Sequence, residues 1–221
     1  MKLLLEALTK FTCGLLLVGL LIFLPAGTLR YTYGWLFIGL LFVPMLIAGF
    51  VMLAKSPEFL KKRLDAKEKQ GTQKGVVALS GLMFIAGFVV AGLDFRFGWS
   101  AMPAWVVITA SVLFLIAYTL YAEVMRENAY LSRTIKVEQG QTVVDTGMYG
   151  IIRHPMYAVT ILLFMMIPLV LGSWYALIAF AFYPAIVIVR LKNEEDLLTK
   201  ELPGYAQYKQ KVKCRIIPYI W

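Results

Sequence analysis

Charged residues are scarce in this chain of 221 residues. They make up 16% of the sequence, whereas hydrophobic residues make up 60%, and the mean hydropathy is +0.74. A soluble domain usually contains about 25% charged residues. The composition therefore excludes an ordinary soluble domain and favours a protein that crosses a membrane several times.

Cysteine and histidine are also rare, with two cysteines and one histidine. Cys13 lies in the first apolar run and Cys214 in a basic tail, on a side of the membrane that we expect to be reducing. We therefore expect no disulfide. Two isolated cysteines do not form a zinc site, and the sequence predicts no metal centre.

Long apolar runs dominate what is present. Each has roughly 15 to 22 residues, near the ~20 that a helix needs to cross a ~30 Å hydrocarbon layer. We expect an all-α fold, a polytopic transmembrane helix bundle of about six spans that ends in a tight helical hairpin plus a cytosolic C-terminal tail. No cleavage pattern follows the first run, which favours an uncleaved helix over a signal peptide. The runs are 11–26, 33–54, 75–93, 101–122, 157–171 and 174–189.

No internal repeat or inter-domain linker is visible in the sequence. We divide the single membrane domain into two regions. Residues 1–122 form a four-span N-terminal bundle with a basic cytosolic loop at 55–74. Residues 123–221 form a catalytic region with a cytosolic connector, the helical hairpin 155–193 and the C-terminal tail.

The basic residues predict the orientation. With both termini in the cytosol, all of the 22 lysines and arginines except Arg30 and Arg96 fall on the cytosolic side. Such an excess is the positive-inside pattern. It also accounts for the net charge of +9, which we attribute to topology and to attraction to anionic membrane lipid; we expect no nucleic-acid partner.

Polar segments separate the apolar runs. In the loop after the second run, Ser56 can cap a short amphipathic helix with Pro57 in its first turn, although a solvated charged loop is the open alternative. Residues 123–133 continue the fourth helix. Residues 134–145 alternate in polarity and turn at Gln139-Gly140, which indicates extended structure. In the outer loop, Asp94 and Arg96 are placed to pair.

The sole histidine lies at the mouth of the last hairpin. Counted from the turn at 172–173 at ~1.5 Å per residue, His154 lies ~28 Å back and Arg190 to Glu194 lie ~26 to 32 Å forward, so the two groups meet at one depth. Pro155 suits the first turn of a helix. The positive end of that helix and Arg153 together predict an anion site.

Carboxylates from the other leg of the hairpin, Glu194 and Glu195, face this site, and Arg190 lies one turn before Glu194. Each residue alone has an ordinary interpretation: His154 as a helix cap, Arg153 as an interface anchor, the glutamates as a solvated helix face. The hairpin geometry brings all of these side chains to the same end of the two helices. Together they favour a site for a small ligand that carries an anion together with hydroxyl or ammonium groups.

The C-terminal third carries a set of motifs in a fixed order. They are Gly147-x-Tyr149, Arg153-His154-Pro155-x-Tyr157, the hydrophobic hairpin, Glu194-Glu195-x-x-Leu198 and Gly204-Tyr205-x-x-Tyr208, followed by Val212 and Pro218. In these residues the chain resembles the isoprenylcysteine carboxyl methyltransferase family, membrane methyltransferases that include phospholipid methyltransferase relatives.

The resemblance implies S-adenosylmethionine as cofactor, held on the cytosolic side by the hairpin ends and the tail. It also implies methyl transfer to a lipophilic acceptor, a carboxylate, amine or thiol, at the cytosolic interface. Arg153 and Glu194 are the candidate catalytic residues, since the first can orient a carboxylate and the second can serve as a base. The candidate cofactor-binding residues are Gly147, Tyr149, His154, Tyr157, Arg190, Glu194, Glu195 and Tyr205.

Two other functions stay open at this point. An NADPH-dependent membrane reductase of the sterol reductase type resembles the same C-terminal region, but the short chain favours a methyltransferase. A transporter or structural protein predicts ionisable residues near span midpoints, and none lies there. The expected partners are a lipophilic or lipidated substrate and membrane lipid; the sequence does not indicate an oligomeric state.

Overall fold

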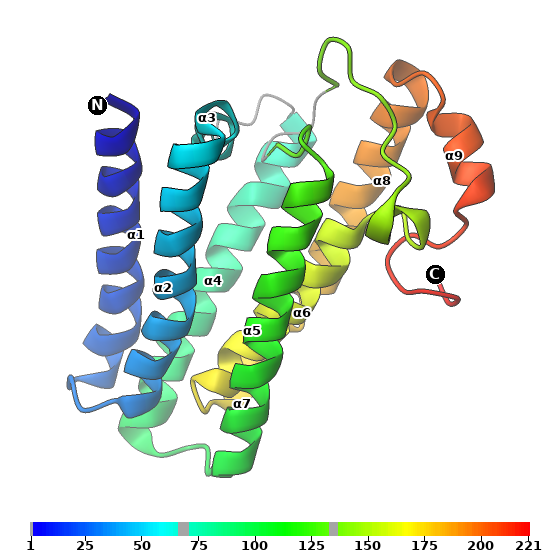
Figure 1. The fold of residues 1–221 in the computed structure, drawn as a ribbon. Coiled ribbons are helices and arrows are strands. Elements are labelled where there is room, and N and C mark those ends of the chain that lie inside the picture. Colours follow the sequence, from blue (N-terminus) through cyan, green and yellow to red (C-terminus); the bar gives the residue numbers. More distant parts are fainter. Residues whose placement is uncertain (1, 66–70, 133–136) are drawn as a thin grey trace.

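The computed structural model describes residues 2–65, 71–132 and 137–221, and the described residues form helices without any strand. The all-α helix bundle expected from the sequence is confirmed (Figure 1). Its elements are α1 (Lys2–Ala26), α2 (Thr32–Lys55), α3 (Pro57–Leu64), α4 (Gly71–Phe97), α5 (Ala104–Glu127), η1 (Gly147–Gly150, a 3-10 turn), α6 (Pro155–Val170), α7 (Trp174–Phe180), α8 (Tyr183–Glu201) and α9 (Tyr205–Lys211).

Five helical segments of the described chain are long and apolar enough to span a membrane: α1, α2, residues 73–97 of α4, α5, and α7 with α8 taken together. The helix α6 has 16 residues, or about 24 Å of length, which is less than the ~30 Å hydrocarbon layer. A count of six spans therefore depends on α6, which forms the first leg of the hairpin.

The second leg of the hairpin is broken, whereas the sequence predicted one continuous span. The helix α7 ends at Phe180 and α8 begins at Tyr183. Pro184 lies in the first turn of α8. Its ring nitrogen carries no hydrogen for a bond to the carbonyl of Phe180, so a continuous helix would lose a bond there.

Close helix contacts hold the bundle together. The helix α4 packs against α1 on one side and α7 on the other. At Gly92 an added Cβ would lie 2.5 Å from the carbonyl oxygen of Ile22, and at Gly87 it would lie 2.4 Å from Cε2 of Phe180. Because only glycine permits these distances, the two residues set how closely α4 approaches its neighbours.

A buried aspartate fixes the outer turns. Asp94 is 2% exposed and accepts hydrogen bonds from the backbone N–H of Ser100 at 2.7 Å and its hydroxyl at 2.6 Å. The Ser173 hydroxyl also donates to Asp94 and accepts from the N–H of Ala176 at 3.0 Å, which caps α7. The predicted ion pair between Asp94 and Arg96 does not form. Ser100 and Ser173 donate hydrogen bonds to the Asp94 carboxylate instead, and the Arg96 guanidinium lies over the ring of Phe97.

At the other end of the bundle lie the N-terminus, α3, the C-terminal ends of α5 and α8, and α9 (Figure 1). The short helix α3 exists as predicted, but Ser56 makes no side-chain capping bond. The helix α5 ends at Glu127, earlier than the predicted Arg133. The predicted turn at 139–140 is confirmed by the bond from Gln141 N–H to the Glu138 carbonyl at 3.0 Å. Residues 134–136 of the expected extended segment lie outside the described residues.

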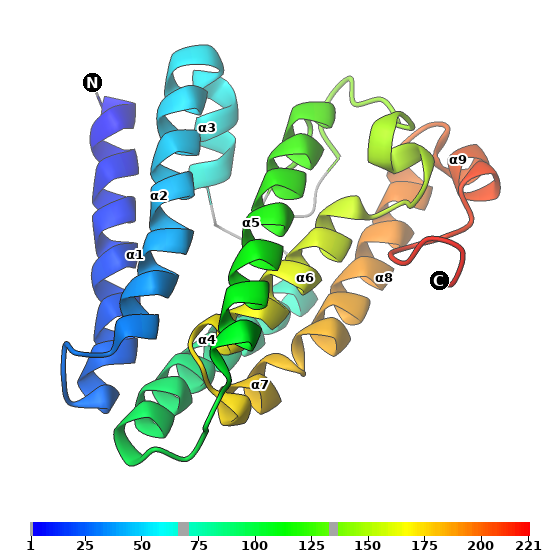
Figure 2. The same ribbon diagram turned by 60° about the horizontal axis from the view of Figure 1, so that its bottom comes forward.

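The views in Figures 1 and 2 place α1 and α2 at one flank of the bundle and α8 and α9 at the other. The helices α5 and α6 pack closely against each other between them. The motif-bearing residues therefore gather at the flank away from α1.

Candidate functional site

The C-terminal tail closes the mouth of the hairpin. The backbone N–H of Arg153 donates to the carbonyl of Cys214, and that of His154 donates to the carbonyl of Arg215, both at 2.9 Å. These bonds fix the two residues that precede α6, whose first helical residue is Pro155. His154 occupies the N-cap position, but its side chain does not cap the helix. The ring is therefore available for other contacts.

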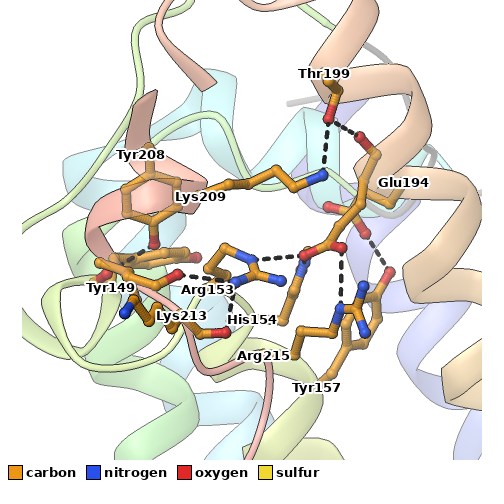
Figure 3. A network of polar contacts seen from close by, with 12 residues as sticks. Tyr149, Arg153, His154, Tyr157, Glu194, Thr199, Tyr208, Lys209, Lys213 and Arg215 are labelled. Atoms are coloured by element: carbon orange, nitrogen blue, oxygen red, sulfur yellow. Dashed lines mark hydrogen bonds and ion pairs between the residues drawn. The ribbon is translucent and has the colours of Figure 1, made fainter. Parts of the chain in front are cut away.

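Glu195 lies at the centre of a largely buried ion-pair cluster, and Figure 3 labels its partners Arg153, His154 and Arg215. Its Oε1 lies 2.6 Å from Nε of Arg153 and 3.2 Å from Nε2 of His154. Its Oε2 lies 3.1 Å from Nε of Arg215. Glu195 is 3% exposed, Arg153 7% and His154 5%. A buried carboxylate is tolerated only with such partners, so the cluster joins α8 to the start of α6 and to the tail.

Arg153 is also held by the tail backbone. Its Nη1 donates to the carbonyls of Val212 and Lys213, each at 2.8 Å. With Nε on Glu195, the guanidinium is fixed in one orientation. The single carboxylate of Glu195 neutralises only one of the two guanidinium charges of Arg153 and Arg215. A net positive charge therefore remains beside the first turn of α6.

A second polar group forms around the hydroxyl of Tyr157. This hydroxyl donates to Oε2 of Glu194 and accepts from Nε of Arg190 at 3.0 Å. The sequence predicted Arg190 as a partner of Glu194, and the structure places the Tyr157 hydroxyl between the two side chains. Glu194 and Glu195 are thus neighbours in sequence but belong to different groups.

A cavity of about 470 Å³ lies beside both groups, within the usual range for small-ligand sites. Its apolar part is lined by α4, α6 and α8, through residues such as Val76, Phe84, Phe164 and Ile186. Seven of the nine residues predicted for the site line this cavity, namely Tyr149, Arg153, His154, Tyr157, Arg190, Glu194 and Tyr205.

The other two predicted residues, Gly147 and Glu195, do not line the cavity. Gly147 has a positive φ of 51°, and an added Cβ would lie 2.7 Å from the carboxyl carbon of Glu127. The Thr146 hydroxyl donates to that carboxylate at 3.0 Å. Gly147 therefore forms the turn that positions Tyr149, while Glu195 holds the cations beneath the cavity wall.

Two tyrosines of α9 reach toward the site. The hydroxyl of Tyr208 donates to the backbone carbonyl of Tyr149 at 2.7 Å. The hydroxyl of Tyr205, a residue 3% exposed, is buried and has no hydrogen-bond partner in the described part of the chain. Burial, followed by the negative charge of Glu195, raises the pKa of Tyr205 well above its usual value, so this group stays a protonated donor at neutral pH.

Two residues that the structure places at the site, Tyr208 and Arg215, were not among those predicted from the sequence. Tyr208 belongs to the quoted Gly-Tyr-x-x-Tyr motif and could have been included on that ground. Arg215 gave no comparable signal, because it is one of several basic residues in the tail and only the fold brings it to Glu195.

The donor set suits a ligand of mixed charge. Cationic side chains gather at the start of α6, a carboxylate on α8 faces the same cavity, and tyrosine rings and hydroxyls line it between them. Among the described residues, histidine, cysteine and acidic side chains form no group of three that could hold a metal ion.

Comparison with known proteins agrees with the motifs. Residues 104–200 match the isoprenylcysteine carboxyl methyltransferase family, which confirms the resemblance inferred from the sequence. The match implies a membrane methyltransferase, and no comparison supports the reductase alternative. A curated relative, the uncharacterized protein YpbQ of Bacillus subtilis (strain 168), is 25% identical over 165 residues, which cover 74% of this chain and 95% of YpbQ.

Proposed function

We propose that the protein transfers a methyl group from S-adenosylmethionine to a lipophilic acceptor at the cytosolic face of a membrane. One observation carries the proposal: a single cavity is lined both by charged side chains, among them Arg153 just before α6 and Glu194 on α8, and by apolar side chains of α4, α6 and α8. A cavity of this kind suits a zwitterionic cofactor beside a hydrophobic substrate. The methyltransferase family match supplies the reaction class.

The residues present fit S-adenosylmethionine. The net positive charge of Arg153 and Arg215 at the first turn of α6 suits a carboxylate. Glu194 faces the cavity and suits an ammonium group or ribose hydroxyls. The buried, unpartnered hydroxyl of Tyr205 is a donor that a polar ligand would satisfy.

When bound, S-adenosylmethionine supplies an activated methyl group on a sulfonium, so the protein needs mainly to align the acceptor and exclude water. As the alternative to holding the cofactor carboxylate, the fixed guanidinium of Arg153 can orient an acceptor carboxylate. Glu194 can take the proton from an amine or thiol acceptor, with its position set by the bond from Tyr157. These two residues remain our candidates for the catalytic step.

The acceptor would enter from the membrane. The apolar wall of the cavity is formed by α4 and α8, which belong to candidate membrane spans, and by the shorter apolar helix α6. The excess of basic residues at the end of the bundle that holds the site favours the cytosolic side. A substrate dissolved in the inner leaflet could then reach the cavity laterally.

Ligand binding tests the proposal directly. We would titrate the purified full-length chain in detergent with S-adenosylmethionine, S-adenosylhomocysteine and NADPH by calorimetry. We expect binding of the first two. The Tyr205→Phe variant should bind S-adenosylhomocysteine about 10-fold more weakly, since one hydrogen bond from a buried donor is lost. Tyr175→Phe, on an exposed side chain at the other end of the bundle, is the control.

Binding of NADPH, without binding of S-adenosylmethionine or S-adenosylhomocysteine, would contradict the proposal. Equal affinities of Tyr205→Phe and the unmodified chain would mean that α9 does not contribute to the cofactor site. A separate experiment, which follows labelled methyl groups from S-adenosylmethionine into membrane lipid or into protein, would identify the acceptor class.

A further inference from the structure

A second cavity, of about 440 Å³, lies among α1, α2, α3, α5 and α6. Its walls are mostly apolar, with contributions from Leu8, Phe11, Met45, Met52, Leu60 and Leu163. Three of the five helices, α1 to α3, precede the region that matches the methyltransferase family, which begins at residue 104. The N-terminal half of the chain therefore builds a space that the family match does not cover.

The two cavities are adjacent. Four residues line both of them: Arg63 of α3, Tyr121 of α5, and Thr160 and Phe164 of α6. Arg63 donates a hydrogen bond from Nη2 to the Tyr121 hydroxyl, and its Cζ lies 5.6 Å from the centroid of the same ring. This pair of side chains stands at the junction between the apolar cavity and the proposed cofactor site.

The charges at the second cavity have one sign. No acidic side chain is among the described residues that line it, and its two basic residues are Lys10 and Arg63. Lys10 is engaged by Glu6 at 2.6 Å and by the carbonyl of Leu64 at 2.8 Å. A mostly apolar space with the Arg63 guanidinium in its lining fits a hydrocarbon chain whose polar end lies at that residue.

We propose that this second cavity holds the hydrocarbon chain of the methyl acceptor, a single-chain amphiphile, and that Arg63 and Tyr121 position its polar end at the cofactor site. The inference rests on the proposed methyltransferase function and names the class of acceptor. Residues 41 to 53 of α2 line the cavity over about 18 Å of helix axis. The cavity is thus long enough to select acceptors by chain length.

Glycines of α2 give a matched pair of variants. Gly49 lines the second cavity, and an added Cβ there meets no atom within 4 Å. Gly39 lies on the same helix with equally open space, but it lines neither cavity. Gly49→Leu should therefore fill the cavity. Gly39→Leu is the control, because it changes the helix propensity of α2 in the same way but leaves both cavities unchanged.

The experiment is photo-crosslinking of the full chain in phospholipid nanodiscs, with palmitic acid that carries a diazirine at the end of its chain. We expect cross-links on Phe11, Met45 and Met52, competed by unlabelled palmitic acid. Gly49→Leu should lower them about 10-fold, and Gly39→Leu should leave them unchanged. If Gly49→Leu accumulates poorly, Ala48→Leu narrows the same cavity.

The inference would be overturned if the cross-links spread evenly over exposed residues such as Leu17 and Ile108. Equal cross-link yields in the two glycine variants would also overturn it. Either result would mean that the space holds only bilayer lipid. Both variants should bind S-adenosylhomocysteine like the unmodified chain. That measurement separates the two proposals, because a failure of cofactor binding contradicts the methyltransferase, whereas a failure of localised cross-linking contradicts only the chain cavity.

Discussion

At the scale of single residues, the adjacent carboxylates Glu194 and Glu195 take different parts. Successive residues of a helix point about 100° apart, so only one of the two can face the cavity. Glu195 faces Arg153, His154 and Arg215, and Glu194 faces Tyr157 and the cavity. We infer that Glu195 contributes to stability and that Glu194 contributes to ligand contact.

We expect Glu195→Gln to destabilise the fold by about 3–5 kcal/mol, because it removes the carboxylate that pairs with the buried guanidinium of Arg153 and the half-buried one of Arg215. The thermal unfolding midpoint of the purified protein in detergent measures this effect. Glu123→Gln, which breaks a solvent-exposed pair with Arg126, is the matched control and should change the midpoint little. Equal midpoints for the two variants would show that the Glu195 cluster is not an anchor.

At the scale of helices, small residues decide which pairs approach closely. The aromatic ring of Phe180 on α7 lies against the backbone of α4 at Gly87. This contact fixes the outer half of the hairpin, whose inner end carries His154 and Glu194. The packing of α4 on α7 therefore supports the geometry of the site from a distance.

A methyl group at this contact should be costly. We expect Gly87→Ala to lower the stability by about 1–3 kcal/mol, because the added Cβ forces Phe180 to move in a packed core. Gly39→Ala, with open space around it, should be neutral or stabilising since alanine favours helix. Thermal midpoints of the two variants test the difference, and a Gly87→Ala variant as stable as Gly39→Ala would place Phe180 elsewhere.

At the scale of the whole molecule, the end of the bundle that holds the site also holds α3 and the C-terminal ends of α5 and α8 (Figure 1). Lys62 of α3 and Glu138 of the connector form an ion pair at 2.5 Å across this end. The basic residues and the site thus share one side of the membrane, which the positive-inside pattern predicts to be the cytosol.

Cysteine labelling tests this orientation. In a chain with Cys13→Ala and Cys214→Ser, a membrane-impermeant maleimide should label Leu29→Cys in intact cells and Lys61→Cys only after permeabilisation. Both positions are exposed, Leu29 in the loop between α1 and α2 and Lys61 on α3. The reverse labelling pattern would place the site on the outer side and contradict a cytosolic cofactor.

Much of the fold follows from local patterns. Apolar runs predicted the helices, and the two-residue turn predicted the hairpin, because both depend on residues close in sequence. The break between α7 and α8 was missed, since hydropathy is continuous across it and a proline such as Pro44 can also remain inside a helix. The end of α5 at Glu127 was missed because polar residues such as Arg126 continue the helix while Asn128 does not.

The sequence by itself determined that the chain is a helical membrane protein and that His154 lies at the same end of the hairpin as Glu194 and Glu195, because hydropathy and the length of a hairpin are set by consecutive residues. Tertiary structure alone decided that Glu195 anchors while Glu194 faces the cavity, that Arg215 joins the cluster, and that α1 to α3 line a second cavity together with α5 and α6. These features arise from packing between segments far apart in the chain, which no local pattern encodes.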